Sequence, residues 1–311
     1  MNGRDVAAES QGSKVQLLLW FIFIVSVLTV AARLGTKYAM TRKLSWDDYL
    51  MLAAQVAYLA QCIPISIGIA NHLGTPTSGI SDVAIDNFLK AEYASIVFFI
   101  ITLALVKWSI STFIQQLSPS ATHKRLDWVL QTLIGLWVIT SVVVSLFQCA
   151  LPTPWDYVHG LRCVDRRAWW AYVVILNILT DLFTVVLYVL IIGNLQIPRS
   201  KRAIVLAIFL VRLLVIGVSA AQLAVFLGVF SYSDPTGTLW IPIILNQTTL
   251  VISTITACAP YLRPFMESLE SSVNRVESVH GSEEELSGNT NGSYNLENTH
   301  SSVACSYRLS R

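Results

Sequence analysis

Seven long apolar runs follow one another along the chain as far as Cys258, and short polar segments separate them. A helix needs about 20 mostly apolar residues to cross the hydrocarbon core of a bilayer. We therefore expect an all-α fold, a seven-transmembrane helix bundle. The expected spans lie at about 15–34, 48–70, 92–115, 128–149, 169–193, 203–230 and 239–258.

The composition indicates a membrane protein and excludes a water-soluble one. Hydrophobic residues make up 54% of the chain and charged residues only 13%, whereas a soluble domain carries about 25% charged residues. A soluble protein of this size could not bury so much apolar surface. We expect the lipid bilayer to be the partner of this surface. The net charge of +2 is too small to indicate a nucleic acid.

The basic residues between the runs predict how the bundle is oriented. One side holds 11 of them: Arg33, Lys37, Arg42, Lys43, Lys124, Arg125, Arg199, Lys201, Arg202, Arg263 and Arg275. The other side holds 6: Arg4, Lys14, Lys90, Arg162, Arg166 and Arg167. The positive-inside rule places the richer side in the cytoplasm. We therefore expect the N-terminus outside and the C-terminus in the cytoplasm.

The polar ends of the chain predict its division into parts. After Phe265 the sequence becomes rich in Ser, Asn, Gly and Glu. Such a segment buries too little apolar surface to offset the entropy lost on ordering. We expect a short extracytoplasmic N-terminus at 1–14, one membrane domain at 15–265 and a disordered cytoplasmic tail at 266–311.

Charged side chains inside the predicted spans are the main candidates for chemistry. Asp181 lies near the middle of the fifth run, and Asn177 lies four residues earlier on the same helical face. Lys107 lies in the inner half of the third run, and Arg212 lies near the middle of the sixth. Charge at this depth is costly, so these side chains are candidates for ligand binding or proton handling. The alternative is an ion pair between helices that only orients the bundle.

A carboxylate buried at that depth needs a cationic partner or a proton. Lys107 and Arg212 are the two candidate partners of Asp181, because both lie at a compatible depth.

A polar stretch in the seventh run begins at Asn246 and continues with Gln247, Thr248 and Thr249. Polar side chains on membrane helices often donate hydrogen bonds to a neighbouring helix. Helix packing is therefore one interpretation of this stretch. Lining of a ligand cavity is the other, and under it Asn246 joins the candidate ligand-binding residues.

Glu92 lies near the outer end of the third run. An interfacial anchor is the simpler interpretation of its carboxylate, and contact with a ligand at the mouth of a cavity is the alternative.

Two adjacent carboxylates, Asp47 and Asp48, stand at the start of the second run. Acidic residues at a helix N-terminus favour the positive end of the helix dipole. We assign both a structural, capping role. Arg33, Arg42 and Lys43 lie close enough in sequence to pair with them and fix the first loop.

Cys149 and Cys163 flank the loop after the fourth run, on the predicted outer side. Disulfides form in oxidising compartments, so we expect a bond that holds this loop over the mouth of the bundle. Free buried thiols are the alternative. The sequence has no CxxC and no His/Cys grouping with zinc spacing, so we expect no metal.

Two absences concern pigments and common receptors. The seventh run contains no lysine, so a retinal Schiff base has no attachment point there and we expect no cofactor. The third run ends in Phe113-Ile-Gln-Gln rather than Asp-Arg-Tyr, and the seventh lacks Asn-Pro-x-x-Tyr. The hallmarks of common G-protein-coupled receptors are therefore missing.

An ordered series of short motifs runs through the seven spans. It consists of Arg33, Trp46-Asp47-Asp48-Tyr49-Leu50, Gly68 through Gly74, Lys107-Trp108-Ser109, Phe147-Gln148-Cys149-Ala150-Leu151-Pro152, Trp155, Cys163, Asn177-Ile178-Leu179-Thr180-Asp181, Leu195-Gln196 and Thr254 through Phe265. In this order the chain resembles the fungal rhodopsin-domain family, also called the satratoxin-cluster integral membrane protein family, over about residues 15–270.

The resemblance implies a filamentous ascomycete source and a seven-helix membrane protein. Related families include receptor-like proteins of the fungal surface, and other members are encoded in secondary-metabolite gene clusters. The chain departs from the family pattern in two places. The proline often found one or two turns after the Asp of the fifth run is absent, and Tyr188 stands there. The glycine often found early in the sixth run is replaced, with Arg212 nearby.

Three hypotheses for function follow. The first is a receptor-like or small-molecule-sensing protein with a cavity lined by Asp181, Asn177, Lys107, Arg212 and Asn246, whose cytoplasmic loops and tail engage a partner. The second is a membrane-embedded cyclase or isomerase of a metabolite pathway that uses Asp181 as catalytic general acid. The third is a structural or transport accessory whose buried charges serve packing alone.

Overall fold

The computed structural model describes residues 3–71, 73–75, 77, 80–117, 121–158, 162–193, 211–230 and 234–261. The predicted tail at 266–311, the segment between the predicted fifth and sixth spans at 194–202 and the first part of the predicted sixth span lie outside the described residues.

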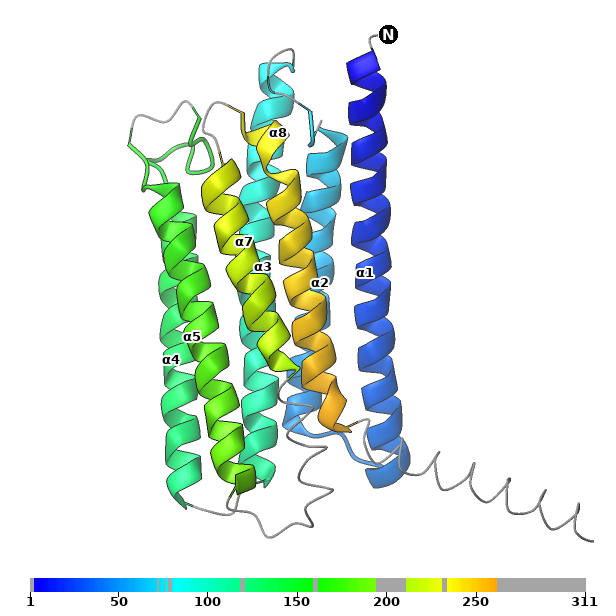
Figure 1. The fold of residues 1–311 in the computed structure, drawn as a ribbon, viewed down its shortest axis with the longest axis vertical. Helices are drawn as coiled ribbons and strands as arrows, with labels where there is room; N and C mark the ends of the chain where they lie inside the picture. Colours follow the sequence, from blue (N-terminus) through cyan, green and yellow to red (C-terminus); the bar gives the residue numbers. More distant parts are fainter. Residues whose placement is uncertain are drawn as a thin grey trace, which may run out of the picture. The chain divides into compact units, whose positions relative to one another are not determined.

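The described part of the chain is a bundle of long helices (Figure 1). They are α1 (Gly3–Thr41), α2 (Trp46–Ala70), α3 (Asp82–Leu117), α4 (Ala121–Leu146), α5 (Arg166–Gly193), α7 (Arg212–Val229), the short α8 (Pro235–Thr238) and a last helix at Trp240–Tyr261. Seven of them are long and apolar enough to cross a membrane, which confirms the predicted all-α, seven-helix fold. We call the helix at Trp240–Tyr261 the last span.

The third helix begins at Asp82, well before the expected start near 92. Its first turns carry charged residues, which a count of apolar positions leaves out. Asp86 and Lys90 form an exposed pair one turn apart, with 2.7 Å between Oδ2 and Nζ. The helix therefore continues beyond its apolar part into a solvent-exposed region, where an ion pair between residues four positions apart stabilises it.

Polar and apolar positions are distributed as expected for a protein dissolved in lipid. Large apolar side chains such as Phe21, Val56 and Leu136 are exposed on the outside of the bundle. Asp181, Arg212 and Gln222 are buried in it. Lipid does not compete for hydrogen bonds, so polar side chains gain most by facing another helix.

One end of the bundle is closed by the disulfide that was expected between Cys149 and Cys163. The main chain beside it is paired, since Val164 N donates to Gln148 O at 2.8 Å and Ala150 N donates to Arg162 O at 3.1 Å. We call this end, at the top of Figure 1, the disulfide end. The disulfide holds the loop between α4 and α5 against the helix ends.

The expectation of Glu92 as an interfacial anchor is wrong, because its side chain is buried. Glu92 forms a salt bridge with Arg166 at the start of α5. It also accepts a hydrogen bond at 2.9 Å from the hydroxyl of Tyr157, in the disulfide-closed loop. The guanidinium of Arg166 lies 4.1 Å from the centre of the Tyr157 ring. Glu92 therefore fastens the loop and α5 to α3.

At the opposite end, Asp47 and Asp48 are completely buried and paired with α1. The salt bridge from Arg33 NH2 to Asp47 Oδ2 is 2.6 Å long. Lys37 Nζ lies 2.9 Å from Asp47 Oδ2 and 2.7 Å from Asp48 Oδ2. The Tyr261 hydroxyl donates to Asp47 Oδ2 at 2.7 Å, and the Arg33 guanidinium lies 4.0 Å from the centre of the Tyr261 ring.

This cluster, which we call the Arg33 cluster, also reaches α3 and the backbone of the last span. Arg33 NH1 donates to Ala257 O at 3.0 Å, and Ser109 Oγ donates to Asp47 O at 2.9 Å. The capping role predicted for both carboxylates falls to Asp48, which accepts from Ser45 N at 2.8 Å. Asp47 instead binds the cations of α1.

The cationic partners differ in part from those predicted. Arg33 was expected and is present, whereas Arg42 and Lys43 are exposed and Lys37 takes their place. Lys37 lies one helical turn after Arg33, so both side chains leave the same face of α1. Arg42 and Lys43 are nearer to Asp47 in sequence, but the pairing depends on which face of α1 is turned toward Asp47.

Replacing Arg33 by Met should destabilise the fold strongly, because the two buried carboxylates keep only Lys37 as a charged partner. Removal of one partner from a buried pair costs about 3–5 kcal/mol. Arg125→Met, at an exposed position of α4, is the matched control and should have little effect. Thermal unfolding in detergent micelles measures both, and equal shifts for the two variants would contradict this account.

Candidate functional site

A buried ion triad joins three helices near the centre of the bundle. Lys107 of α3 places Nζ 2.9 Å from Asp181 Oδ1 of α5. Arg212, at the start of α7, donates from NH2 to the same oxygen at 2.7 Å and from Nε at 3.2 Å. All three side chains are almost fully buried. The two partners predicted for Asp181 from their depth in the spans are therefore the partners that it has.

The triad is held in place by neutral groups. Lys107 Nζ also donates to Asn177 O at 3.0 Å and to Thr180 Oγ1 at 2.8 Å. The Asn177 side chain donates from Nδ2 to Ser219 Oγ of α7 at 3.3 Å. Asn177, predicted to share a face with Asp181, thus supports the triad through its backbone and links α5 to α7 through its amide.

The charges of the triad are unbalanced, since two cations share one carboxylate oxygen. Asp181 Oδ2 and Asn177 Oδ1 are buried, and neither accepts a hydrogen bond from a residue that the structure describes. A buried charge without compensation is costly. The triad therefore favours an additional anion on the cationic side and leaves acceptors free beside Asp181.

Asn246 does not lie in the triad but in a second polar group further along α7. Gln222 donates from Nε2 to Asn246 Oδ1, and Thr249 Oγ1 donates to Gln222 Oε1 at 3.3 Å. Of the five residues proposed for one cavity, the structure brings together Asp181, Asn177, Lys107 and Arg212. Asn246 serves the packing of the last span against α7, with Gln222 as a partner that the sequence analysis did not identify.

The sequence carries a signal for this second group. Arg212, Ser219 and Gln222 follow one another at spacings of seven and three residues, which place them on neighbouring positions of one helix face. All three are buried. One polar face of α7 therefore contacts α5 at one level and the last span at another.

Asp127 of α4 is a further buried carboxyl group that the sequence analysis passed over. It accepts hydrogen bonds from Ser111 Oγ at 2.6 Å, from Gln115 Nε2 at 2.7 Å and from Gln131 Nε2 at 3.1 Å. It lies one residue before the expected start of the fourth span at 128. The helix begins earlier, at Ala121, so the carboxyl group turns inward onto α3.

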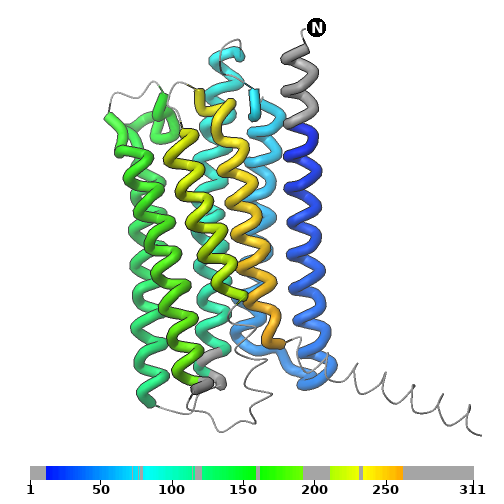
Figure 2. The backbone as a smooth tube through the Cα atoms, viewed as in Figure 1, coloured from blue at the N-terminus to red at the C-terminus, as the bar shows by residue number. Residues whose placement is uncertain are grey.

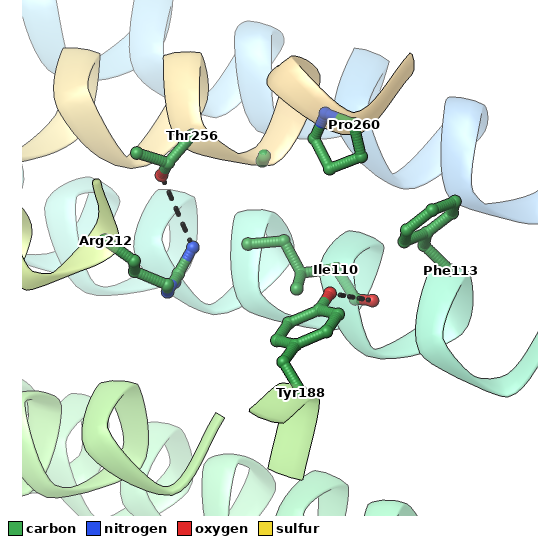
Figure 3. A pocket seen from close by; sticks show the side chains of 7 residues that line it. Ile110, Phe113, Tyr188, Arg212, Thr256 and Pro260 are labelled. Atoms are coloured by element: carbon green, nitrogen blue, oxygen red, sulfur yellow. Dashed lines mark hydrogen bonds between the residues drawn. The ribbon is translucent and has the colours of Figure 1, made fainter. Parts of the chain in front are cut away.

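A pocket opens beside the triad, and Arg212 forms part of its wall (Figure 3). Its other lining residues are Ile110, Phe113, Tyr188, Thr256, Ala257 and Pro260. The Tyr188 hydroxyl donates to Ile110 O at 3.2 Å, and Arg212 NH1 donates to Thr256 Oγ1 at 3.5 Å, which is a long contact. We call this the Arg212 pocket.

The Arg212 pocket lies toward the end opposite the disulfide, because Tyr188 and Pro260 are near the ends of their helices and Arg212 begins its own. Its empty space is about 270 Å³, including the part open to its surroundings. Because this figure includes open space, the enclosed room is much smaller, and the pocket suits one functional group of a ligand or a very small molecule.

Among the residues that the structure describes, no group of three or more His, Cys, Asp or Glu side chains could hold a metal ion.

The triad should behave as one energetic unit. Asp181→Leu leaves two buried cations without their carboxylate and should destabilise the protein by about 3–5 kcal/mol. Adding Lys107→Met to Asp181→Leu should recover part of that loss, because one unpaired charge is then removed. A double-mutant cycle on thermal unfolding measures the coupling.

Asp86→Asn is the control for this cycle, since the Asp86–Lys90 pair is half exposed and such pairs contribute at most about 1 kcal/mol. Strictly additive effects of Asp181→Leu and Lys107→Met would show that the triad is not a unit.

Comparison with known proteins identifies the family. No curated protein matches the chain in sequence. The family model described as the fungal rhodopsin domain matches residues 32–268, which is well over half of the chain. The match extends over the residues of the triad, the Arg212 pocket and the Arg33 cluster. With its seven candidate spans, this chain belongs to the fungal rhodopsin domain family and is a multi-pass membrane protein.

Proposed function

We propose that the protein is a receptor-like membrane sensor that binds a small organic acid in the Arg212 pocket. One observation carries the proposal: Arg212 is both a wall of the pocket and a member of the buried triad. A ligand in the pocket therefore acts directly on the charges that join α3, α5 and α7. Binding at this point is coupled to the arrangement of three helices.

The charge of the triad favours an acidic ligand. Two cations face one carboxylate, and electrostatic attraction is strong in surroundings of low polarity. A ligand carboxylate at Arg212 competes with Asp181 for the same guanidinium. When Asp181 loses this partner, it keeps Lys107, and the salt bridge between α7 and α5 is lost. The helices can therefore adopt two arrangements, one with Arg212 bound to Asp181 and one with Arg212 bound to the ligand, and a sensor needs two such states.

The other lining residues of the pocket indicate the chemical character of the rest of the ligand. Ile110, Phe113 and Pro260 present apolar surface, whereas Tyr188 and Thr256 present hydroxyl groups. This mixture suits a compact, mostly apolar acid. Under the predicted orientation the pocket lies toward the cytoplasm, so the ligand is a metabolite of the cell rather than an external signal.

The alternative of a cyclase or isomerase with Asp181 as general acid has less support. The two cations at 2.7 Å and 2.9 Å from Asp181 Oδ1 stabilise its ionised form. An ionised carboxylate has no proton to donate, so a general acid would have to be another group.

Two details of the chain support a specialised member of the family. The motif order supports a relation to the family members that are encoded in secondary-metabolite gene clusters, and with it a place beside secondary metabolism. Tyr188 and Arg212, which mark the two departures from the family pattern, both line the pocket. We therefore propose that the ligand differs between this protein and its relatives.

Thermal unfolding of the protein in lipid nanodiscs, with a panel of small carboxylic acids and their amides, tests the proposal. An acid should raise the unfolding temperature of the wild type, and its uncharged amide should not. Asp181→Asn should bind the acid about tenfold more tightly, equivalent to about 1.4 kcal/mol, because the competing carboxylate is gone. Ala257→Leu, which fills the pocket, should abolish the response.

Thr132→Val, which alters an exposed hydroxyl bonded only to its own helix at Trp128 O, is the matched control and should respond as the wild type does. Weaker binding of every acid by Asp181→Asn would contradict the competition. A deletion strain of the source organism provides a further test. If a pathway intermediate accumulates in it, and still accumulates after complementation with Asp181→Asn, the protein is an enzyme rather than a sensor.

A further inference from the structure

A second cavity lies toward the disulfide end, between α1, α2 and the last span. Its lining consists of Val15, Leu18, Leu19, Ile22, Ile65, Ile243, Ile244 and Gln247. Seven of these eight side chains are aliphatic. The cavity contains about 210 Å³ of empty space, including the part open to its surroundings. We call it the Gln247 cavity.

The single polar side chain of this cavity has no partner. Gln247 is only 2% exposed, and neither its Oε1 nor its Nε2 forms a hydrogen bond with any of the residues that the structure describes. A buried amide left without hydrogen bonds costs free energy. Its neighbours Asn246 and Thr249 are paired with Gln222 instead. The amide of Gln247 is therefore available to a ligand.

The requirements of that amide are specific. Oε1 accepts hydrogen bonds and Nε2 donates them, so one hydroxyl group can give each of the two atoms a partner. A buried water would find only these two atoms as partners, the lowest number in the range of two to four that such a water makes, because the remaining walls of the cavity are aliphatic. A hydroxyl carried on an apolar body matches the cavity better, because its carbon skeleton gains contact with those walls.

The cavity lies among three candidate membrane-spanning helices, α1, α2 and the last span. Leu17 and Phe21, which alternate along α1 with the lining residues, are 73% and 61% exposed on the outside of the bundle. Figure 2 shows α1 (blue) and the last span (orange) running along the bundle beside each other, and the lining residues confirm that they meet.

We propose that the Gln247 cavity binds a membrane sterol, whose hydroxyl pairs with the Gln247 amide while its ring system lies against α1 and the last span. Five of the aliphatic walls are β-branched Val or Ile side chains, which have few rotamers. They form a stiff surface that suits a rigid ring system. The cavity is too small for a whole sterol, so the far part of the molecule stays in the bilayer.

Photolabelling with a diazirine-bearing, hydroxyl-containing sterol tests the proposal. The full chain is reconstituted in phosphatidylcholine nanodiscs, labelled, digested and analysed by mass spectrometry. Saturable labelling is expected within 15–22 and 243–247, and excess unmodified sterol should displace it. The same sterol with its hydroxyl methylated should compete about tenfold less well, because it can no longer donate a hydrogen bond to Oε1.

Two variants and a control complete the experiment. Gln247→Leu and the cavity-filling Ile244→Trp should each reduce specific labelling at least tenfold. Thr248→Val, which removes a hydroxyl bonded to its own helix at Ile244 O, should label as the wild type does. Thermal unfolding without sterol serves as the folding check: Gln247→Leu should be no less stable than the wild type, because it removes an unpaired amide.

Labelling that does not saturate, or that the methyl ether displaces as well as the free sterol, would overturn the proposal. Unchanged labelling of a folded Gln247→Leu would do the same. The result is independent of the Arg212 pocket, whose ligand is acidic and whose lining shares no residue with this cavity.

Discussion

The hydrocarbon core of a bilayer offers no water to a buried charge, so each ionised side chain inside this bundle depends on partners from other helices. Among the residues that the structure describes, three clusters of paired charges meet this constraint. The Arg33 cluster joins α1, α2, α3 and the last span. The triad of Lys107, Asp181 and Arg212 joins α3, α5 and α7. Glu92 and Arg166 fasten α3 to α5 at the disulfide end. Helix α3 takes part in all three, which makes it the axis of the bundle.

The three clusters differ in their balance of charge, and this difference separates structure from function. In the Arg33 cluster two cations meet two carboxylates, and in the Glu92–Arg166 pair one meets one. The charges of these clusters are balanced, so the clusters are suited to holding helices together. The central triad has two cations for one carboxylate and lies beside a pocket. An unbalanced group next to open space is a better candidate for ligand binding than a balanced one.

The two pockets belong to different surroundings. The Arg212 pocket lies beside buried charges and toward the end opposite the disulfide, which agrees with the acidic group of the proposed ligand. The Gln247 cavity is almost wholly aliphatic and lies between two spans, so it suits a ligand that is already dissolved in the bilayer. Both involve the last span, which also contributes Tyr261 and Ala257 O to the Arg33 cluster. Movements of this helix would therefore reach both pockets.

The sequence by itself determined the number of spans and the choice of Asp181, Lys107 and Arg212, because apolar length and charge at membrane depth are local properties. It also favoured the pairing of Cys149 with Cys163, from their place on the predicted outer side. It did not determine which faces meet. Lys37 rather than Arg42 or Lys43 pairs with Asp47, and Glu92 and Asp127 turn inward. Asn246 binds Gln222 instead of joining Asp181. Only the tertiary structure decided these contacts, because the rotation of each helix depends on its packing against all the others.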